Sequence, residues 1–361
     1  MTRRLGLPSK GPYQVNNACV FSVRGLRCWA VLLSTVALMG GATATSSGLA
    51  ASTAHAGRIA FSVQHGDNTA PWDIYVVRTD GRWILRKKTQ RDETDPAWSP
   101  DGRHIAYFAS WSGGGSGWIY TMNPDGTHRR RLARAVAGLE WSPNSRRIAY
   151  NKYEGSRSGN FSMYVMNADG SGKRLLTRNG SGPVWSPDGK QIAFTRGAAA
   201  YVMNARGGRA RRVGSVGYEG GVDAWAPGRK IIFDRSSDSG FNVAPYVVSA
   251  DGSGLRKLRM PGYDGSGNGG WSPDGQLIVY VAGSAGIRTL RPGDGSVLTV
   301  ARGWGSDPTW GAGGRKIAFT GAFTSARRDG LWVVNRDGRR AHRIAAATGL
   351  DWYSQPTWAP R

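Results

Sequence analysis

The stretch Trp98-Ser-Pro-Asp-Gly-Arg-His-Ile-Ala-Tyr107 decides the fold, because the chain repeats it. Further copies, two of them looser, begin at Trp141, Trp185, Trp225, Trp271 and Trp310, and a last tryptophan of the series stands at Trp358. These tryptophans are separated by 43, 44, 40, 46, 39 and 48 residues. A period of this length is typical of a four-stranded propeller blade. The sequence therefore predicts an all-β propeller.

The rest of each repeat reads as three more short strands. An Asp-Gly or Gly-Gly turn follows strand A, which carries the tryptophan, and leads to strand B, Ile-Ala-Phe or a variant. Strand C, such as Tyr201-Val-Met203, precedes a second turn and a basic strand D, such as Lys173-Arg-Leu-Leu-Thr177. Asp-Gly between β-rich runs is a strong hairpin signal, because glycine accepts the positive φ of tight turns.

The two ends of the repeat region are complementary. Residues 57–61 form a strand B with no strand A before it, whereas residues 355–360 form a strand A with nothing after it. Together they complete one blade. The sequence therefore predicts seven four-stranded blades and a ring closed by a blade that the N- and C-termini share.

Residues 1–56 have the composition of a signal peptide. A basic stretch precedes the apolar run Trp29–Met39, and a small-residue tract ends in Ala54-His55-Ala56. This order of basic, apolar and A-x-A segments predicts cleavage after Ala56 and a propeller domain at 57–361. The apolar run is too short to span a membrane comfortably. We expect a secreted or cell-envelope protein that is not integral to the membrane.

The charge of the chain points to anionic partners. The formal net charge is +24, and only five of the 48 basic residues lie in the first 56 positions. Both cysteines, Cys19 and Cys28, also lie there, so the domain is expected to contain no disulfide. A strongly basic domain attracts polyanions such as envelope polymers. Nucleic acid is not expected as a partner of an exported protein, and we expect a monomer.

The repeats resemble the WD40-like PD40 repeats of the TolB propeller family. The resemblance is carried by Trp-Ser-Pro-Asp-Gly-x-x-Ile-Ala-Phe, Tyr-Val-Met-Asn-x-Asp-Gly and Arg-Leu-Thr. It implies a periplasmic or secreted propeller that works as a protein-binding platform. The chain leaves no room for the amino-terminal α/β domain of TolB, so the lipoprotein partner of that family is not carried over. Related propellers cap serine peptidases, but no Gly-x-Ser-x-Gly motif is present.

One large ring per repeat fits the packing between neighbouring sheets. We therefore interpret the repeat tryptophans as structural residues: Trp98, Trp141, Trp185, Trp225, Trp271, Trp310 and Trp358.

Basic residues gather in the turns between strands C and D, which lie on the same face of a propeller as the A–B turns. The candidates for binding an anionic polymer are Arg129, Arg130, Arg131, Lys173, Arg174, Arg211, Arg212, Arg339 and Arg340. The alternative is that they are solvated turn residues that discourage edge-to-edge aggregation.

Acidic and aromatic residues gather in the D–A loops, on the opposite face. The candidate ligand-binding residues are Asp92, Glu93, Asp95, Glu140, Glu219, Asp223, Asp264, Asp307 and Asp351, with Trp304, Trp352 and Tyr353. Carboxylates beside exposed rings suit a basic peptide or a carbohydrate. Core-facing aromatics and ordinary surface acids are the alternative.

Signals for metals, cofactors and catalysis are weak. The segment Asp264-Gly-Ser-Gly-Asn268-Gly lacks the closing glutamate of a calcium loop, and the histidines are scattered over different repeats. No cofactor or metal is expected. The sequence favours a secreted module that binds a protein or an anionic cell-envelope polymer. A glycan lyase or hydrolase using the acidic face, and a structural envelope protein retained by charge, remain as alternatives.

Overall fold

The structure is a computed structural model of the chain. It describes residues 57–66, 70–86, 88–111, 116–154, 161–217, 220–236, 243–263, 265, 268–323, 329–346 and 352–360. Apart from the short 3-10 helix η1 (Gly283–Ala285), the regular structure of these residues is β-strand. In this part of the chain, no helix is long and apolar enough to cross a membrane. The predicted signal peptide, 1–56, lies outside the described residues.

The strands are short and follow one another along the chain. The first ten are β1 (Arg58–Gln64), β2 (Trp72–Arg78), β3 (Trp83–Leu85), β4 (Asp92–Trp98), β5 (Ile105–Ser110), β6 (Gly117–Met122), β7 (Arg130–Trp141), β8 (Arg147–Tyr153), β9 (Phe161–Asn167) and β10 (Arg174–Thr177). The next eight are β11 (Ser181–Trp185), β12 (Gln191–Arg196), β13 (Ala199–Asn204), β14 (Arg211–Ser215), β15 (Val222–Ala226), β16 (Lys230–Ser236), β17 (Val243–Ser249) and β18 (Arg256–Lys257). The last nine are β19 (Asn268–Trp271), β20 (Ile278–Val281), β21 (Ile287–Leu290), β22 (Val297–Ala301), β23 (Gly303–Trp310), β24 (Lys316–Phe323), β25 (Asp329–Asn335), β26 (His342–Ala346) and β27 (Trp352–Trp358).

The strands pair into antiparallel sheets that follow the repeats. Five sheets have four strands, in the orders β27-β1-β2-β3, β11 to β14, β15 to β18, β19 to β22 and β23 to β26. The remaining sheet runs from β4 to β10, because the long strand β7 pairs with β6 through Arg130–Ala135 and with β8 through Val136–Trp141. These findings confirm the predicted all-β architecture of four-stranded antiparallel units.

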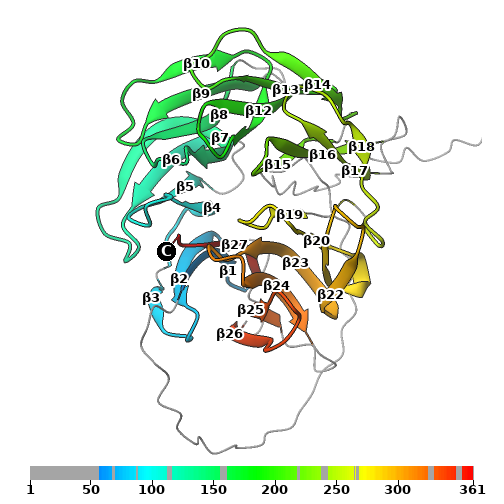
Figure 1. Cartoon of the computed structure of the whole chain (residues 1–361). Coiled ribbons are helices and arrows are strands. Elements are labelled where there is room, and N and C mark those ends of the chain that lie inside the picture. The colour runs from blue at the N-terminus through cyan, green and yellow to red at the C-terminus, as the bar shows by residue number, and fades with distance from the viewer. Residues whose placement is uncertain are drawn as a thin grey trace, which may run out of the picture.

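The first and last described strands lie in one sheet. Strand β1 pairs with β27, with Ile59 opposite Trp358 and Gln64 opposite Trp352. The inner strands β27, β4, β7, β11, β15, β19 and β23 each contact the next in this order, and β23 also contacts β27. Figure 1 shows the sheets following one another around a common centre.

The Ser-Pro-Asp-Gly phrase folds as a tight turn. The Ser99 hydroxyl donates to Asp101 Oδ1 at 2.6 Å, and the Arg103 amide donates to the same oxygen at 3.1 Å. Gly102 has φ 70°, a conformation that glycine adopts without the strain of a Cβ, and its amide donates to the Ser99 carbonyl at 2.8 Å. The turn satisfies its own polar groups, so Ser99 is buried at no cost in hydrogen bonds.

The repeat tryptophans join neighbouring sheets. The indole Nε1 donates to a backbone carbonyl from Trp98 to Thr357 (3.2 Å), from Trp141 to Ala97 (3.1 Å), from Trp185 to Glu140 (3.2 Å) and from Trp310 to Gly270 (3.1 Å). Each acceptor directly precedes the tryptophan of the preceding sheet. Trp225 is also buried, whereas Trp271 and Trp358 are half-buried. These bonds fix the angle at which one sheet meets the next, beyond the burial of the rings.

Candidate functional site

Three inner strands carry a strained bulge with a polar side chain. Asp95 on β4, Asp307 on β23 and Gln355 on β27 have φ values of 56°, 49° and 54°. Each stands three residues before a repeat tryptophan, where two other repeats have Gly138 and Gly182, also at positive φ. The register of β4 and β23 shifts at these positions. A side chain at positive φ costs free energy, and such strain gathers at functional sites.

The three residues form a chain of contacts across neighbouring sheets, which we call the bulge cluster. The Asp95 amide donates to Gln355 Oε1 at 3.0 Å, and the Gln355 amide donates to Asp307 Oδ2 at 3.4 Å. A bulge leaves a backbone amide out of its own ladder. In the bulge cluster, the side chain of the preceding sheet accepts that amide.

Asp95 is a buried carboxyl group with a raised pKa. The residue is only 8% exposed, and Oδ1 has no hydrogen-bond partner among the described residues. Burial raises the pKa of Asp95 to about 7, and the negative charge of Asp307 acts in the same direction. Asp95 can therefore hold or release a proton near neutral pH.

Glu93 and Arg129 meet, although their loops were predicted to lie on opposite faces. Arg129 Nη1 donates to Glu93 Oε1 at 2.6 Å. Glu93 is buried, and its pKa is raised by burial although Arg129 opposes that shift. The guanidinium also lies over the Tyr107 ring, 5.8 Å from its centroid. Arg129 is thus half-buried against Glu93 and Tyr107. The assignment of loops to faces from the sequence could not show this contact, because it does not take the length of the side chains into account.

Two other predicted acids accept backbone amides. Asp92 Oδ1 accepts the Trp72 amide at 3.1 Å, and Glu140 Oε2 accepts the Trp185 amide of the next sheet at 3.2 Å. Asp223, on β15, is buried. Glu219, Asp264 and Asp351 lie outside the described residues.

The three predicted aromatic residues are not equivalent. Trp304, on β23, is 51% exposed. The half-buried Tyr353, on β27, donates its hydroxyl to the Ala346 carbonyl at 2.6 Å. Trp352 lies on β27 as well, but its side chain lies outside the description.

The other basic candidates are exposed. Arg174 Nη1 donates to the Arg206 carbonyl at 2.7 Å and Arg211 Nη2 donates to the Ala250 carbonyl at 2.5 Å, so each reaches the turn of the next sheet. Arg131 lies 4.3 Å from the centroid of the Trp118 ring, and Lys173 donates to its own turn. The exposed candidates are Arg130, Arg131, Lys173, Arg174, Arg211, Arg212, Arg339 and Arg340.

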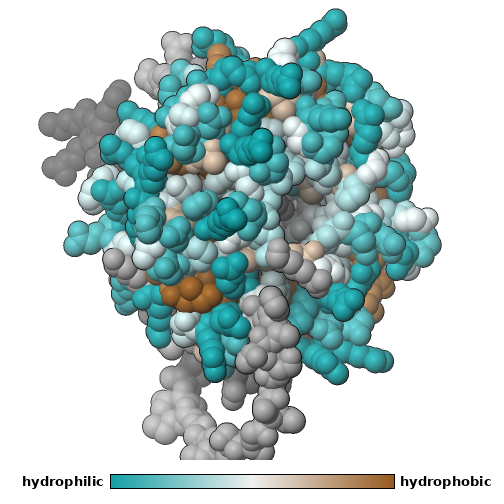
Figure 2. Space-filling model, turned by 60° about the vertical axis from the view of Figure 1, so that its left-hand side comes forward, coloured by the Kyte–Doolittle hydropathy of each residue, from teal (hydrophilic) through white to brown (hydrophobic). Residues whose placement is uncertain are grey.

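These exposed cations keep their charge available. None of the eight forms an ion pair with another described residue. Figure 2 shows hydrophilic side chains over most of the side that it presents. The sequence did not predict that arginines at the start of strand D brace one sheet against the next.

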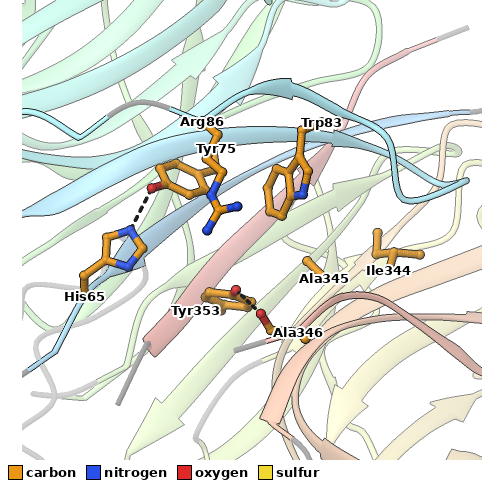
Figure 3. A pocket seen from close by; sticks show the side chains of 8 residues that line it. All are labelled: His65, Tyr75, Trp83, Arg86, Ile344, Ala345, Ala346 and Tyr353. Carbon is orange, nitrogen blue, oxygen red and sulfur yellow. Dashed lines mark hydrogen bonds between the residues drawn. The ribbon is translucent and has the colours of Figure 1, made fainter. Parts of the chain in front are cut away.

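A cavity of about 190 Å³ lies between β26 and the sheet of β1, β2, β3 and β27. Its polar and aromatic lining consists of His65, Tyr75, Trp83, Arg86 and Tyr353 (Figure 3). The sequence singled out only Tyr353 of this set. Within the described part of the chain, no three His, Cys, Asp or Glu side chains are placed to hold a metal ion.

Strand order, bulges and turns together define a β-propeller of repeated four-stranded units. The family model of the TolB beta propeller domain, PD40, matches residues 133–361. The chain therefore belongs to the TolB β-propeller family, as its repeats indicated. No curated protein matches the chain.

Several solved structures share the fold. TolB from Acinetobacter baumannii is 20% identical, with 84% of this chain and 67% of that chain covered and a TM-score of 0.53. An oligogalacturonate lyase in complex with manganese is 13% identical, with 77% and 85% covered and a TM-score of 0.58. Puromycin hydrolase is 16% identical, with 81% of this chain but only 53% of the hydrolase covered and a TM-score of 0.61. At these identities the likeness shows the fold alone.

Proposed function

We propose that the chain is an exported propeller of seven blades that binds an anionic cell-envelope polymer through its basic C–D turns. Five of the sheets are taken as one blade each, and the seven-stranded sheet is taken as two blades that share β7. Strand β7 is then the outer strand of one blade and the inner strand of the next. The pairing of β1 with β27 supports closure of the ring by a blade that the two termini share.

The observation that carries this proposal is the excess of exposed arginine over acid in two turns. The turn between β6 and β7 contains a single carboxylate, Asp125, and β7 then begins with Arg130 and Arg131. The turn between β13 and β14, residues 205–210, contains no acid, and β14 then begins with Arg211 and Arg212. Asp125 is already satisfied by the hydroxyl and amide of Thr127. The guanidinium groups are thus the groups free to meet an anion.

Two of the arginines are also held in place. Because Arg174 and Arg211 each donate to a carbonyl of the next sheet, they lose little conformational freedom when an anion binds their remaining donors. Polymer phosphates, sulfates or carboxylates would replace condensed counterions at such sites. Binding is therefore expected to weaken steeply as salt rises.

The test is the salt dependence of binding to dextran sulfate, with neutral dextran as the blank. The variant combines Arg130→Gln, Arg131→Gln and Arg212→Gln. The matched control combines Arg178→Gln, Arg259→Gln and Arg302→Gln. These three arginines are exposed and lie after strands β10, β18 and β22, so their replacement removes the same amount of charge.

Log affinity should fall with log salt, and we expect this fall to be less steep in the first triple variant. The magnitude of the slope should decrease by roughly 2 to 3, since each lost phosphate-like contact removes about one released counterion. The control should lower it by less than 1. Equal losses in the two triple variants would show that net charge alone retains the protein, and equal binding to both dextrans would reject the proposal.

A second candidate function is cleavage of an acidic glycan at the bulge cluster. It is favoured by the carboxyl pair Asp95 and Asp307, because Asp95 has a pKa near the pH at which a general acid or base works best. An oligogalacturonate lyase also shares the fold. Incubation with oligogalacturonate should then give unsaturated or shortened products that Asp95→Asn abolishes. If the substrate is unchanged, cleavage is rejected and polymer binding remains the proposed function.

A further inference from the structure

An aromatic pair recurs in the middle of the sheets. The ring on the second strand of a unit stacks on the ring directly opposite it on the third strand, at interplanar angles of 21°, 27°, 24° and 14°. The pairs are Tyr107–Tyr120, Tyr150–Tyr164, Phe194–Tyr201 and Phe233–Tyr246. Each pair is covered by a cation of its own unit, namely Arg129, Lys152, Arg196 and Arg235 in that order.

The sheet of β1, β2, β3 and β27 departs from this arrangement. Phe61 and Tyr75 occupy the same cross-strand position, but their rings meet edge to face at 71°. Tyr353 and Trp83 also contact Phe61, with ring centroids 5.2 and 6.1 Å away. The cation of this unit, Arg86, lies over Trp83 instead, 5.5 Å from its centroid.

The turned rings border the cavity instead of filling it. Tyr75 and Trp83 are perpendicular, at 89°, and the opposite wall is made by Ala345 and Ala346 of β26, which are too small to close the space. Figure 3 shows the Arg86 guanidinium and the His65 ring directed into the space between the rings. Among the five units compared, this unit alone breaks the stacked pair, and its turned rings line the cavity.

The chemistry of the lining is cationic and aromatic. Arg86 offers up to five N–H donors, His65 Nε2 is 2.7 Å from the Tyr75 hydroxyl, and none of the described lining residues is Asp or Glu. An arginine next to a planar ring recognises a carboxylate by its donors while the rings hold a flat or cyclic body. A cationic ligand would have to displace Arg86 from Trp83 and meet no counter-charge among these residues.

The volume limits the size of the ligand. At about 190 Å³, the cavity is smaller than the roughly 300–1,000 Å³ that hold drug-sized molecules. We propose that this cavity binds a single six-membered ring that carries a carboxylate. The ring is that of an aromatic acid or of a uronic acid at the end of a glycan. This site is separate from the basic turns, and its occupation does not depend on polymer binding.

The experiment measures ligand-observed NMR titrations of residues 57–361 with benzoate and with glucuronate. Benzyl alcohol and glucose are the neutral partners of the two acids. The variants are Arg86→Gln and Trp83→Leu. The matched control is Arg91→Gln with Trp111→Leu, which removes a cation–π pair at 4.8 Å outside the cavity.

We expect at least one acid to bind at least tenfold more tightly than its neutral partner, because a hydrogen bond to a charged group is lost in the neutral compound. Arg86→Gln should weaken the acid tenfold or more without affecting the neutral compound, Trp83→Leu should weaken both, and the control should change neither. Preference for benzoate or for glucuronate decides between the two sources of the ring. The proposal is overturned if neither acid binds more tightly than its neutral partner, or if the Arg86 and Arg91 variants lose affinity equally.

Discussion

Replacement of Asp95 by asparagine should stabilise the protein at neutral pH and above. The pKa of Asp95 is raised from 3.8 to about 7 by burial. The folded state therefore keeps a proton between about pH 4 and pH 7 that the unfolded state releases. Stability is lost as pH rises through this window, because the unfolded chain binds fewer protons than the folded one.

The magnitude follows from the same values. A pKa of about 7 against 3.8 makes ionisation of Asp95 in the folded protein cost about 4 kcal/mol at alkaline pH. Asparagine keeps the shape, tolerates the positive φ of 56° and carries no charge. We therefore expect Asp95→Asn to raise the free energy of unfolding by up to about 4 kcal/mol at pH 8 and by less than about 1 kcal/mol at pH 4.

The assay is denaturant unfolding of residues 57–361 from pH 4 to pH 8, for the unchanged protein and the variant. Asp307→Asn is the control, since removing its charge should lower the pKa of Asp95 and flatten the profile only in part. If the two stability profiles stay parallel over the whole range, Asp95 is not the buried titrating group that the bulge cluster implies.

Three further predictions test the turns, the sheet contacts and export. Trp141→Phe should lower the free energy of unfolding by roughly 0.5–1.5 kcal/mol more than Trp225→Phe, as thermal unfolding would show. The reason is that Trp141 loses its indole bond to the Ala97 carbonyl, whereas the Trp225 indole donates to no described residue. Equal losses would show that the indole bond does not contribute to stability. Hydrogen bonds from the Ser186 hydroxyl and the Lys190 amide lower the pKa of Asp188. The stability lost in Asp188→Ala should therefore be largest above pH 4 and should decrease at lower pH, where Asp188 of the unchanged protein is protonated. Thermal unfolding at several pH values would show this. Amino-terminal sequencing of the exported protein should begin at Gly57, and a start beyond Phe61 would remove part of β1.

The sequence predicted the repeated unit well, because the tryptophan phrase carries its own turn chemistry. Ser99, Asp101 and Gly102 form a self-contained hydrogen-bonded turn, so local sequence is enough to identify it. The continuous strand β7 was not predicted. Residues 132–136, Leu-Ala-Arg-Ala-Val, have no turn signal, and the chain passes straight from one unit to the next.

The candidate sites depend on contacts that sequence spacing does not show. Alignment of Asp95 with Gly138 and Gly182 could have revealed the shared bulge, since glycine marks positive φ. The aromatic cavity could not have been found in this way. It depends on how Tyr353 and Trp83 turn the Phe61–Tyr75 pair, and on the small residues that β26 presents from a different sheet.

The central claim is that the chain ends share a blade that closes the propeller and holds its binding surfaces in place. Deletion of the chain from Gln355 onward tests it most directly. The deletion removes the Trp358 partner of Ile59, the carbonyl that accepts the Trp98 indole, and the side chain that accepts the Asp95 amide. We predict that thermal unfolding of the truncated protein shifts downward by more than 10 °C or loses cooperativity, as expected when an inner strand is lost from a ring of dependent units. A truncated protein that melts within about 2 °C of the intact one would contradict closure through a shared blade.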